Sequence, residues 1–451
     1  MATIRKATAE GQPTFVAAAA VVGLLTGLVA GSFGLLLDAA GRGRVDLVRW
    51  AHGWQVPGFL LVVAICAAAT GAAAWLVHRV EPHAEGSGIP RVEAVVEGRA
   101  EPGRFRILPV KYVGGLLSIG SGLALGREGP SVQMGGNIAV IVAAVLRRSR
   151  SDVRVLVAAG AAAGLATAFN APIAGGVFVL EELVKRFDPR TTLATLVASA
   201  AGFAGAHLVL HATTTTDFRV PALGEPTLAQ APSVVTLGVA AGLLGVAYNG
   251  AVMAGLRIAD RSRVPVVARA LAVGAAVGAI GWWATPLVGG GDNLTQRALL
   301  GHGAVLAVLG LITVRFALGV VSYAAATPGG LFAPMLVLGS QLGLLVGLLG
   351  HAVAPHATLA PAGLALIGMA AFFTSTVRAP VTGIVLATEM TGSTSQLAPM
   401  LGACAIAMLV AMALRCAPIY DQLTRRSASA ARENAAEAAS SSHARPASIA
   451  G

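Results

Sequence analysis

Apolar segments recur along almost the whole chain, separated by short polar links and by glycine-proline breaks. The first, near residues 14–38, is longer than the roughly 20 residues that a transmembrane helix needs. Only 12% of the residues are charged and the mean hydropathy is +0.75, whereas about 25% of a typical soluble domain is charged. Aromatic residues make up only 5%, so Ala and Gly must supply the close helix contacts. The sequence therefore predicts an all-α polytopic membrane protein whose surroundings are a lipid bilayer.

A polar link containing Arg42, Arg44 and Arg49 is expected after the first span, which we expect to be an uncleaved anchor. A second span is expected near 57–79. Further apolar helices are expected near 109–125, 130–147, 153–169, 172–186, 191–211, 232–257, 265–288, 303–325, 331–353, 361–376, 380–391 and 396–415. Many of these are short or broken by glycine, and broken helices at membrane depth are tolerated only where they line a cavity or are buried in protein.

The net charge of +11 does not indicate a nucleic-acid partner, because the Arg and Lys residues lie in links and chain ends of a very apolar chain. Six basic residues between Arg79 and Lys111 favour a cytoplasmic location for that link. The three arginines of the first link weaken this signal.

An internal repeat indicates that the chain consists of two related halves. Ala171-Pro172 precedes Gly175 and Glu181 with the spacing at which Ala379-Pro380 precedes Gly383 and Glu389, 208 residues later. Gly129-Pro130 and Gly135 are likewise matched by Ala333-Pro334 and Gly339, 204 residues later. Repeated halves with broken helices place a substrate site at their interface, near the bilayer midplane. The expected divisions are a cytosolic N-terminus (1–13), half-repeat 1 (14–211), an aqueous loop (212–231), half-repeat 2 (232–423) and a disordered cytosolic tail (424–451).

Three glycine-proline breaks are the candidate site. They are Gly86-Ser87-Gly88-Ile89-Pro90, Gly126-Arg127-Glu128-Gly129-Pro130 and Gly330-Leu331-Phe332-Ala333-Pro334. Proline suits the first turn of a helix, and the free amide N–H groups there attract anions. Three converging helix starts would replace the hydration shell of an anion without burying a full positive charge.

Glu128 is an ionisable residue at membrane depth, which indicates function. Its carboxylate can occupy the site of a free anion and leave when protonated, so that anion occupancy is coupled to proton binding. The alternative is a capping carboxylate that only stabilises a helix start.

With these motifs, the chain resembles the CLC family of chloride channels and proton/chloride antiporters. The three breaks match the family's selectivity-filter segments in order, and the stretches Leu108-Pro109-Val110-Lys111-Tyr112, Phe169-Asn170-Ala171-Pro172 and Pro418-Ile419-Tyr420 are also similar. The similarity runs from about residue 14 to residue 423. It implies a fold of two inverted-topology half-repeats with many tilted and broken helices. It also implies a homodimer in the bacterial inner (plasma) membrane, with both termini cytoplasmic.

The resemblance further implies roles for individual residues. Ser87 and Tyr420 would donate hydroxyl hydrogen bonds to a central chloride, and Leu331 and Phe332 would donate backbone amides. Glu128 would be the gate and proton acceptor on the extracellular side, and Glu182 the internal proton relay. Chloride and protons would be the transported ions, with no cofactor.

The bland alternatives are a turn or cap hydroxyl for Ser87, an interfacial tyrosine for Tyr420, core packing for Phe332 and a solvated charge for Glu182. Lys111 is either a functional charge or a paired lysine in an apolar stretch.

The predicted function is exchange of chloride for protons. The alternative is a passive voltage- or proton-gated chloride channel, which Glu182 argues against because channel-type relatives commonly lack an acid there. An enzyme is not expected, because the sequence carries no nucleophile elbow, phosphate loop or zinc-protease signature. No metal site is expected either, since His207 and His211 have the spacing of a metal pair but no further ligand at matching spacing.

Overall fold

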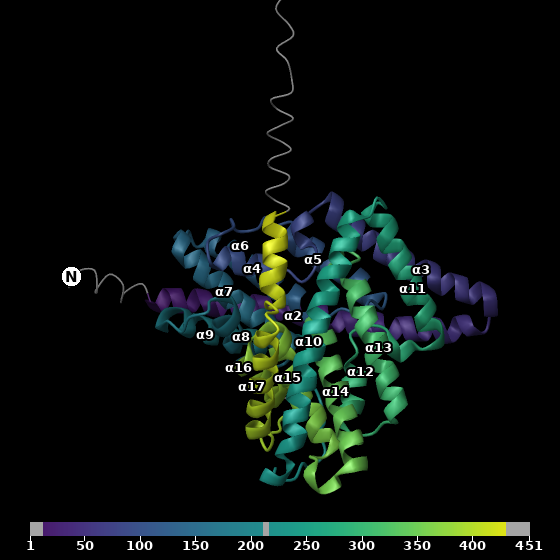
Figure 1. Ribbon diagram of the computed structural model, residues 1–451. Coiled ribbons are helices and arrows are strands. Elements are labelled where there is room, and N and C mark those ends of the chain that lie inside the picture. The colour runs from purple at the N-terminus through teal and green to yellow at the C-terminus, as the bar shows by residue number, and fades with distance from the viewer. Residues whose placement is uncertain (1–11, 211–215, 430–451) are drawn as a thin grey trace, which may run out of the picture.

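The structure, a computed structural model, describes residues 12–210 and 216–429 of the 451-residue chain (Figure 1). Within these residues the regular structure is helical, apart from two isolated bridges. Eight of the described helices are long and apolar enough to cross a membrane. The predicted all-α membrane architecture is therefore confirmed.

The helices before residue 211 are α2 (Gln12–His52), α3 (Gln55–Arg79), η1 (Pro82–Ala84), α4 (Ile89–Val96), α5 (Ile107–Gly120), α6 (Glu128–Val145), α7 (Arg150–Ala168), α8 (Pro172–Phe178), the π-helical turn η2 (Val179–Leu183) and α9 (Pro189–Leu210). Those after residue 215 are η3 (Leu228–Gln230), α10 (Ala231–Arg261), α11 (Val266–Trp283), η4 (Thr285–Leu287), α12 (Asp292–Leu299), α13 (Val305–Tyr323), α14 (Phe332–Val353), η5 (Pro355–Ala357), α15 (Pro361–Val377), α16 (Pro380–Thr391) and α17 (Leu397–Ala413).

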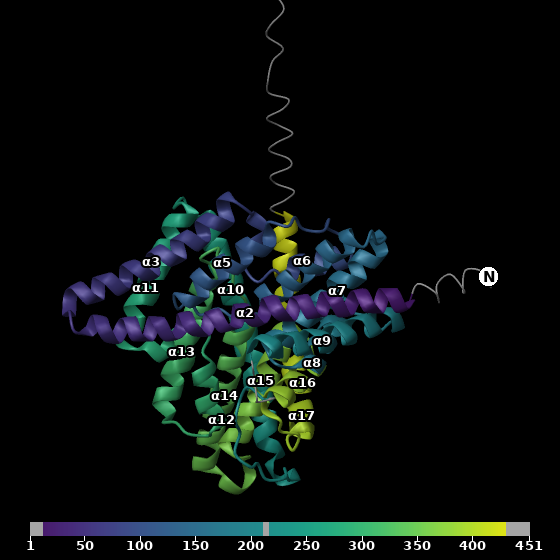
Figure 2. The ribbon, with the colours of Figure 1, turned by 180° about the vertical axis from the view of Figure 1, so that it is seen from behind.

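The polar link expected after residue 38 is instead part of α2, which continues for 41 residues to His52. The link contains several Ala and Arg residues, which favour helix, and no proline occurs between residue 38 and Pro57. Figure 2 shows α2 crossing the whole width of the molecule and packing along α9. A helix of this length carries its arginines beyond the apolar stretch without a break.

Corresponding helices of the two repeats pack in the same way. Helix α6 packs against α7 as α14 packs against α15, and α2 against α9 as α10 against α17. The repeated glycines explain part of this. A Cβ on Gly135 would lie 2.0 Å from the carbonyl oxygen of Gly160, and one on Gly339 would lie 2.4 Å from that of Gly368. Both positions must remain glycine for the helix backbones to touch.

The repeated glutamates bind the two halves to each other. Glu389 accepts hydrogen bonds from the backbone N–H groups of Ile173 and Ala174 at the start of α8, at 3.0 and 2.6 Å. Glu181 accepts equivalent bonds from Val381 and Thr382 at the start of α16, at 3.1 and 2.7 Å. Each carboxylate thus caps the first turn of the other repeat's short helix.

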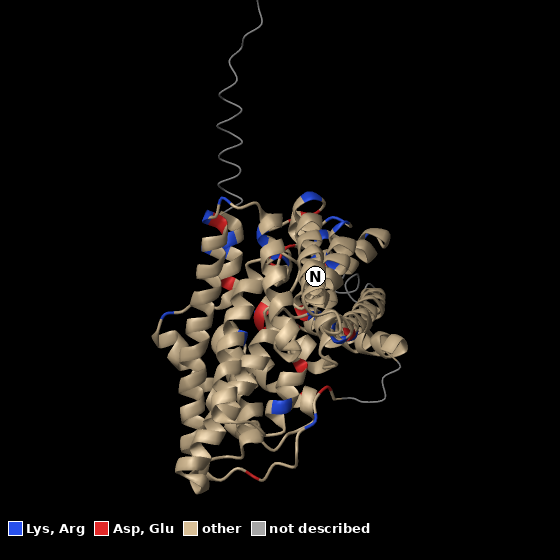
Figure 3. Cartoon of the chain, turned by 90° about the vertical axis from the view of Figure 1, so that its right-hand side faces the viewer, with Lys and Arg blue, Asp and Glu red and all other residues tan. Residues whose placement is uncertain are grey.

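The chain is helical from residue 419 to residue 429, so the tail expected from Thr424 onward does not begin there. Thr424 is buried, and Arg426 forms an ion pair with Asp260 of α10 at 2.6 Å. These contacts hold residues 424–429 against the membrane part. The expected termini at 1–11 and 430–451 lie outside the described residues. Figure 3 shows Lys and Arg mainly towards one end of the molecule, with most of the helical surface uncharged.

Candidate functional site

The three glycine-proline breaks meet in the structure, although they are far apart in sequence. Gly126 and Gly330 exchange two backbone hydrogen bonds of 2.8 Å each. The Gly86 N–H donates to the carbonyl of Thr327 at 3.1 Å, and the N–H of Gly329 donates back to Gly86 at 3.0 Å. These bonds join the starts of α4, α6 and α14 at one place. The three helix N-termini thus lie next to one another, as the sequence predicts.

Gly129 allows the first two breaks to touch. A Cβ on Gly129 would lie 2.3 Å from the hydroxyl oxygen of Ser87 and 2.7 Å from its carbonyl oxygen. Any other residue would force the α4 start away from the α6 start. The glycine is therefore explained by close backbone approach at the site.

Two buried hydroxyl groups face this junction without protein partners. Ser87 and Tyr420 are almost fully buried, and neither hydroxyl oxygen has a hydrogen-bond partner among the described residues. The two hydroxyl groups lie close to each other. The Tyr420 ring lies 6.3 Å from that of Phe332, which begins α14. A buried hydroxyl without a partner is costly, so this pair is suited to donate to a small anion.

The Glu128 carboxylate lies over the same junction. Glu128 is 4% exposed, and its Oε2 atom has no hydrogen-bond partner among the described residues. A Cβ on Gly126 would lie 1.9 Å from this oxygen, and the backbone N–H of Ala333 interacts with the carboxylate. The side chain thus folds back onto the filter backbone, where a negative group meets helix-start amides.

Arg127 turns away from the filter. Its Nε donates to the carbonyl of Ala168 at 3.2 Å, and its Nη1 lies 3.9 Å from Asp38. The guanidinium is held by these two partners and still acts electrostatically on Glu128.

Two cavities reach Glu128 from one side, which we call the Glu128 vestibule. The smaller has a volume of about 190 Å³ and is lined by Asp38, Arg127, Asp217 and Asp292 besides Glu128. The larger, of about 1000 Å³, shares Asp38, Arg127, Glu128 and Asp292 with it and is also lined by Arg42, Arg44, Arg49 and Arg297. Asp217 is exposed at the cavity wall, where partial desolvation raises the pKa of Asp217 to about 6; Arg127 opposes this shift, and Asp292 and Asp38 add to it. Sequence reasoning missed the three aspartates, because nothing in their spacing brings them together.

Glu182 lies in the π-helical turn η2, which follows α8. It is 5% exposed, and its Oε1 atom has no hydrogen-bond partner among the described residues. Its neighbour Glu181 points instead to the start of α16. The two adjacent acids therefore differ in environment. Glu181 caps the start of α16, whereas Glu182 is buried without a hydrogen bond to Oε1. Tyr420 is close enough to interact electrostatically with both Glu182 and Glu128.

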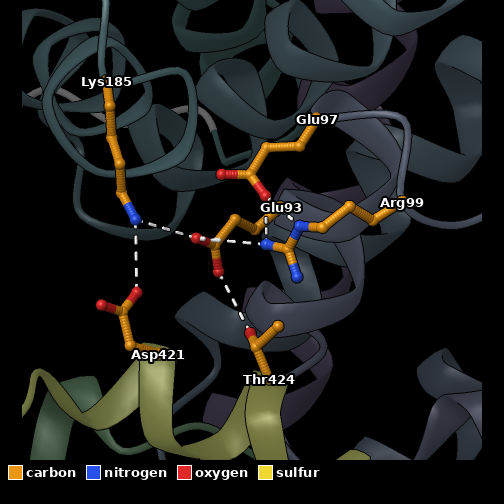
Figure 4. Close-up of polar contacts among 6 residues, drawn as sticks. All are labelled: Glu93, Glu97, Arg99, Lys185, Asp421 and Thr424. Atoms are coloured by element: carbon orange, nitrogen blue, oxygen red, sulfur yellow. Dashed lines mark hydrogen bonds and ion pairs between the residues drawn. The ribbon is translucent and has the colours of Figure 1, made fainter. Parts of the chain in front are cut away.

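A polar network surrounds Glu93, which sequence reasoning also missed (Figure 4). Glu93 is 2% exposed, and its Oε1 lies 3.0 Å from the Nζ of Lys185 and 3.8 Å from Arg99. Thr424 donates to Oε2 at 3.1 Å, and Lys185 also contacts Asp421 at 3.2 Å. The sequence does carry one signal for it, because Glu93 is an acidic residue that lies four residues after Ile89, in the short helix that follows the first glycine-proline break.

Lys111 is a backbone ligand and not a free charge. Its fully buried ammonium group donates to the carbonyls of Ala84 and Gly86, at 3.0 and 2.7 Å. These bonds fix the segment that leads into Ser87. The paired-lysine interpretation is thus the one the structure supports.

The histidine pair yields no further site. His207 Nδ1 contacts the carbonyl of Phe203 at 2.9 Å, and His211 lies outside the described residues. Among residues 12–210 and 216–429, no group of three or more His, Cys, Asp or Glu side chains is arranged to hold a metal ion.

Comparison with known proteins gives one consistent result. Residues 69–412 match the voltage-gated chloride channel family. The chain is 35% identical over 417 residues to the H(+)/Cl(-) exchange transporter ClcA of Vibrio parahaemolyticus, covering 90% of this chain and 88% of the relative. It is 34% identical over 438 residues to the transporter of the same name from Salmonella gallinarum, covering 94% and 91%. The solved structure of a slow cyanobacterial Cl⁻/H⁺ antiporter superposes with a TM-score of 0.86 at 30% identity, covering 92% of this chain and 97% of that one.

Proposed function

Since the chain belongs to the voltage-gated chloride channel (CLC) family, we propose that it is a secondary active transporter that exchanges chloride for protons, and not a passive channel. Relatives at 35% and 34% identity are exchange transporters, and the matching solved structure is an antiporter. In this proposal an acid on each side of the anion site passes the proton on. Glu128 and Glu182 would supply this pair, and Tyr420 interacts electrostatically with both.

The observation that carries the proposal is the position of the Glu128 carboxylate over the three joined helix starts. While ionised, it occupies the place that chloride needs. Protonation removes its charge and its attraction to the amide N–H groups, so the side chain can swing into the vestibule. Chloride then enters and is held by the hydroxyls of Ser87 and Tyr420 and by the amides of Leu331 and Phe332.

The proton continues from Glu128 towards Glu182 past Tyr420. A buried ionisable group at membrane depth is costly unless it serves transport. Because Glu128 serves both ions, chloride and protons cannot pass through it at the same moment. That competition is what couples the two flows.

The test is chloride efflux from liposomes that contain the purified protein, with external pH recorded at the same time. We expect chloride leaving the vesicles to drive protons inward against their gradient. Glu128→Gln should abolish proton movement while chloride still flows, and Glu182→Gln should also abolish proton movement. Chloride flux without proton movement in the unmodified protein would establish the passive channel instead.

We further propose a homodimer in the bacterial inner membrane, with both termini cytoplasmic and the Glu128 vestibule outside. Family membership supports these assignments. Light scattering of the detergent-solubilised protein gives the mass of the assembly, and labelling of cysteines introduced at the two chain ends gives their side. A monomeric mass, or labelling from outside the cell, would overturn the respective assignment.

A further inference from the structure

One polar network connects the three segments that carry Ser87, Glu182 and Tyr420. Glu93 follows Ser87 on α4, Lys185 follows Glu182 after η2, and Asp421 follows Tyr420 on the helix of residues 419–429. Lys185 bridges the two acids, at 3.0 Å from Glu93 and 3.2 Å from Asp421 (Figure 4). The network thus lies beside the site, where it can hold Tyr420 in place relative to Ser87.

The two acids of the network depend on Lys185 to different degrees. Glu93 retains Arg99 and the Thr424 hydroxyl when Lys185 is removed, so its buried charge stays compensated. Lys185 is the ion-pair partner that the described residues offer Asp421. Loss of Lys185 would therefore remove the tie at Asp421, next to Tyr420, while Thr424 still links the 419–429 helix to Glu93 of α4.

Lys185 remains charged while it does this. Burial opposes its charge, but the hydrogen bond that Lys185 donates to Glu93 and the carboxylates of Glu93, Asp421 and Glu182 outweigh burial and raise the pKa of Lys185. Glu182 faces Lys185 together with Glu93, Asp421 and Glu181. Lys185 is the cation among these neighbours of Glu182. The same ammonium group therefore stabilises the charge of Glu182 and pairs with Asp421, the residue next to Tyr420.

We propose that Lys185, through Asp421, is a positioning residue that holds Tyr420 against the Ser87 segment and so keeps the Glu182 side of the chloride path closed during proton transfer. This inference rests on the proposed roles of Ser87, Glu182 and Tyr420. Without the tie, the Tyr420 segment opens independently of Glu128. Chloride then crosses without a proton whenever both ends are open.

The test compares Lys185→Gln and Asp421→Asn in the liposome assay, with chloride and proton movement recorded together. Each should lower the number of protons moved per chloride about fivefold, while chloride flux is retained or rises. Lys185→Arg should restore the ratio. Because both substitutions break one bridge, the double variant should be no worse than either single variant. A merely structural role would lower both flows in parallel.

Asp260→Asn is the matched control, because it breaks the Arg426 pair on the same helix, which faces α10. Its proton-to-chloride ratio should stay normal. Hydrogen exchange of residues 419–429 gives a second measurement, and Lys185→Gln should increase it more than Asp260→Asn does.

An unchanged ratio in Lys185→Gln and Asp421→Asn, with Glu182→Gln still losing proton movement, would overturn this inference alone. An equal loss of coupling in Asp260→Asn would also overturn it. Normal proton movement in Glu182→Gln would overturn the relay and this inference together.

Discussion

Glu128 and Glu182 are both almost completely buried carboxylic acids, but the chain surrounds them in opposite ways. Glu128 stands at a glycine-rich helix start with cavities beside it, so its side chain has somewhere to go. Glu182 sits in a π-helical turn, where it interacts electrostatically with Glu93, Lys185, Asp421 and Glu181. One acid is therefore suited to move and the other to exchange a proton in place.

The largest effect that tests this contrast is the response of chloride flux to pH. Glu128→Gln and Glu182→Gln should both abolish proton movement. Only Glu128→Gln should also make chloride flux nearly independent of pH on the vestibule side, because only Glu128 blocks the anion path while ionised. Chloride efflux at a series of vestibule-side pH values measures this.

Glu101→Gln is a suitable control for those two variants, since Glu101 is exposed and pairs only loosely with Arg150 at 3.6 Å. It should leave both flows unchanged. If Glu182→Gln flattened the pH response as strongly as Glu128→Gln, the division into a mobile and a fixed acid would be wrong.

The anion site between the two acids should depend on the Tyr420 hydroxyl. Tyr420→Phe keeps the ring beside Phe332 and removes one donor to a charged ligand, a bond worth about 1.5–3 kcal/mol. Chloride affinity should fall about tenfold or more, as measured by titration calorimetry. Tyr248→Phe is the matched control, because that hydroxyl is also buried without a partner and its ring packs on Phe316 and Phe372. Equal affinity losses in the two variants would remove Tyr420 from the site.

A smaller effect separates Glu182 from its neighbour Glu181. Glu181→Gln and Glu389→Gln each leave one amide oxygen facing two backbone N–H donors, which should cost about 1–2 kcal/mol. The Tm should fall in both variants while the proton-to-chloride ratio stays normal. Glu182→Gln should show the reverse pattern. Loss of proton movement in Glu181→Gln would mean that the relay acid had been assigned to the wrong member of the pair.

The sequence was informative where local chemistry decides the structure. Helices α8 and α16 start at Pro172 and Pro380, and Pro130 lies in the first turn of α6, as proline and glycine predict. The repeated glycines mark close helix contacts. The filter breaks could be recognised because each carries its own turn residues.

The groupings of residues that could not be predicted from the sequence are those formed by tertiary contacts. Asp38, Asp217 and Asp292 come from three distant elements, and their approach to Arg127 is visible only after folding. Lys185 and Asp421 are ordinary charges in sequence and become a bridge only because residues 419–429 continue as a helix. The length of α2 was missed for the same reason, since polar residues in a long helix resemble a link.

The smallest predicted effect concerns the vestibule around Glu128. The pKa of Asp217 is raised to about 6, so this carboxyl is neutral below pH 6 and adds a negative charge to the vestibule as the pH rises through that value. That charge repels chloride. In the Glu128→Gln background, where the gate no longer titrates, chloride flux should therefore still fall by less than about twofold between pH 5 and pH 7, since water and salt screen a charge at a cavity wall.

Adding Asp217→Asn to Glu128→Gln should abolish this residual fall, because the amide stays neutral throughout the range. Glu225→Gln is the control, since Glu225 lies on the same loop but is not among the residues that line the vestibule cavities. A residual pH response that survives Asp217→Asn would show that the Asp217 carboxyl is not its source. The contrast between Glu128 and Glu182 would stand in that case, because it does not depend on the charge of the vestibule wall.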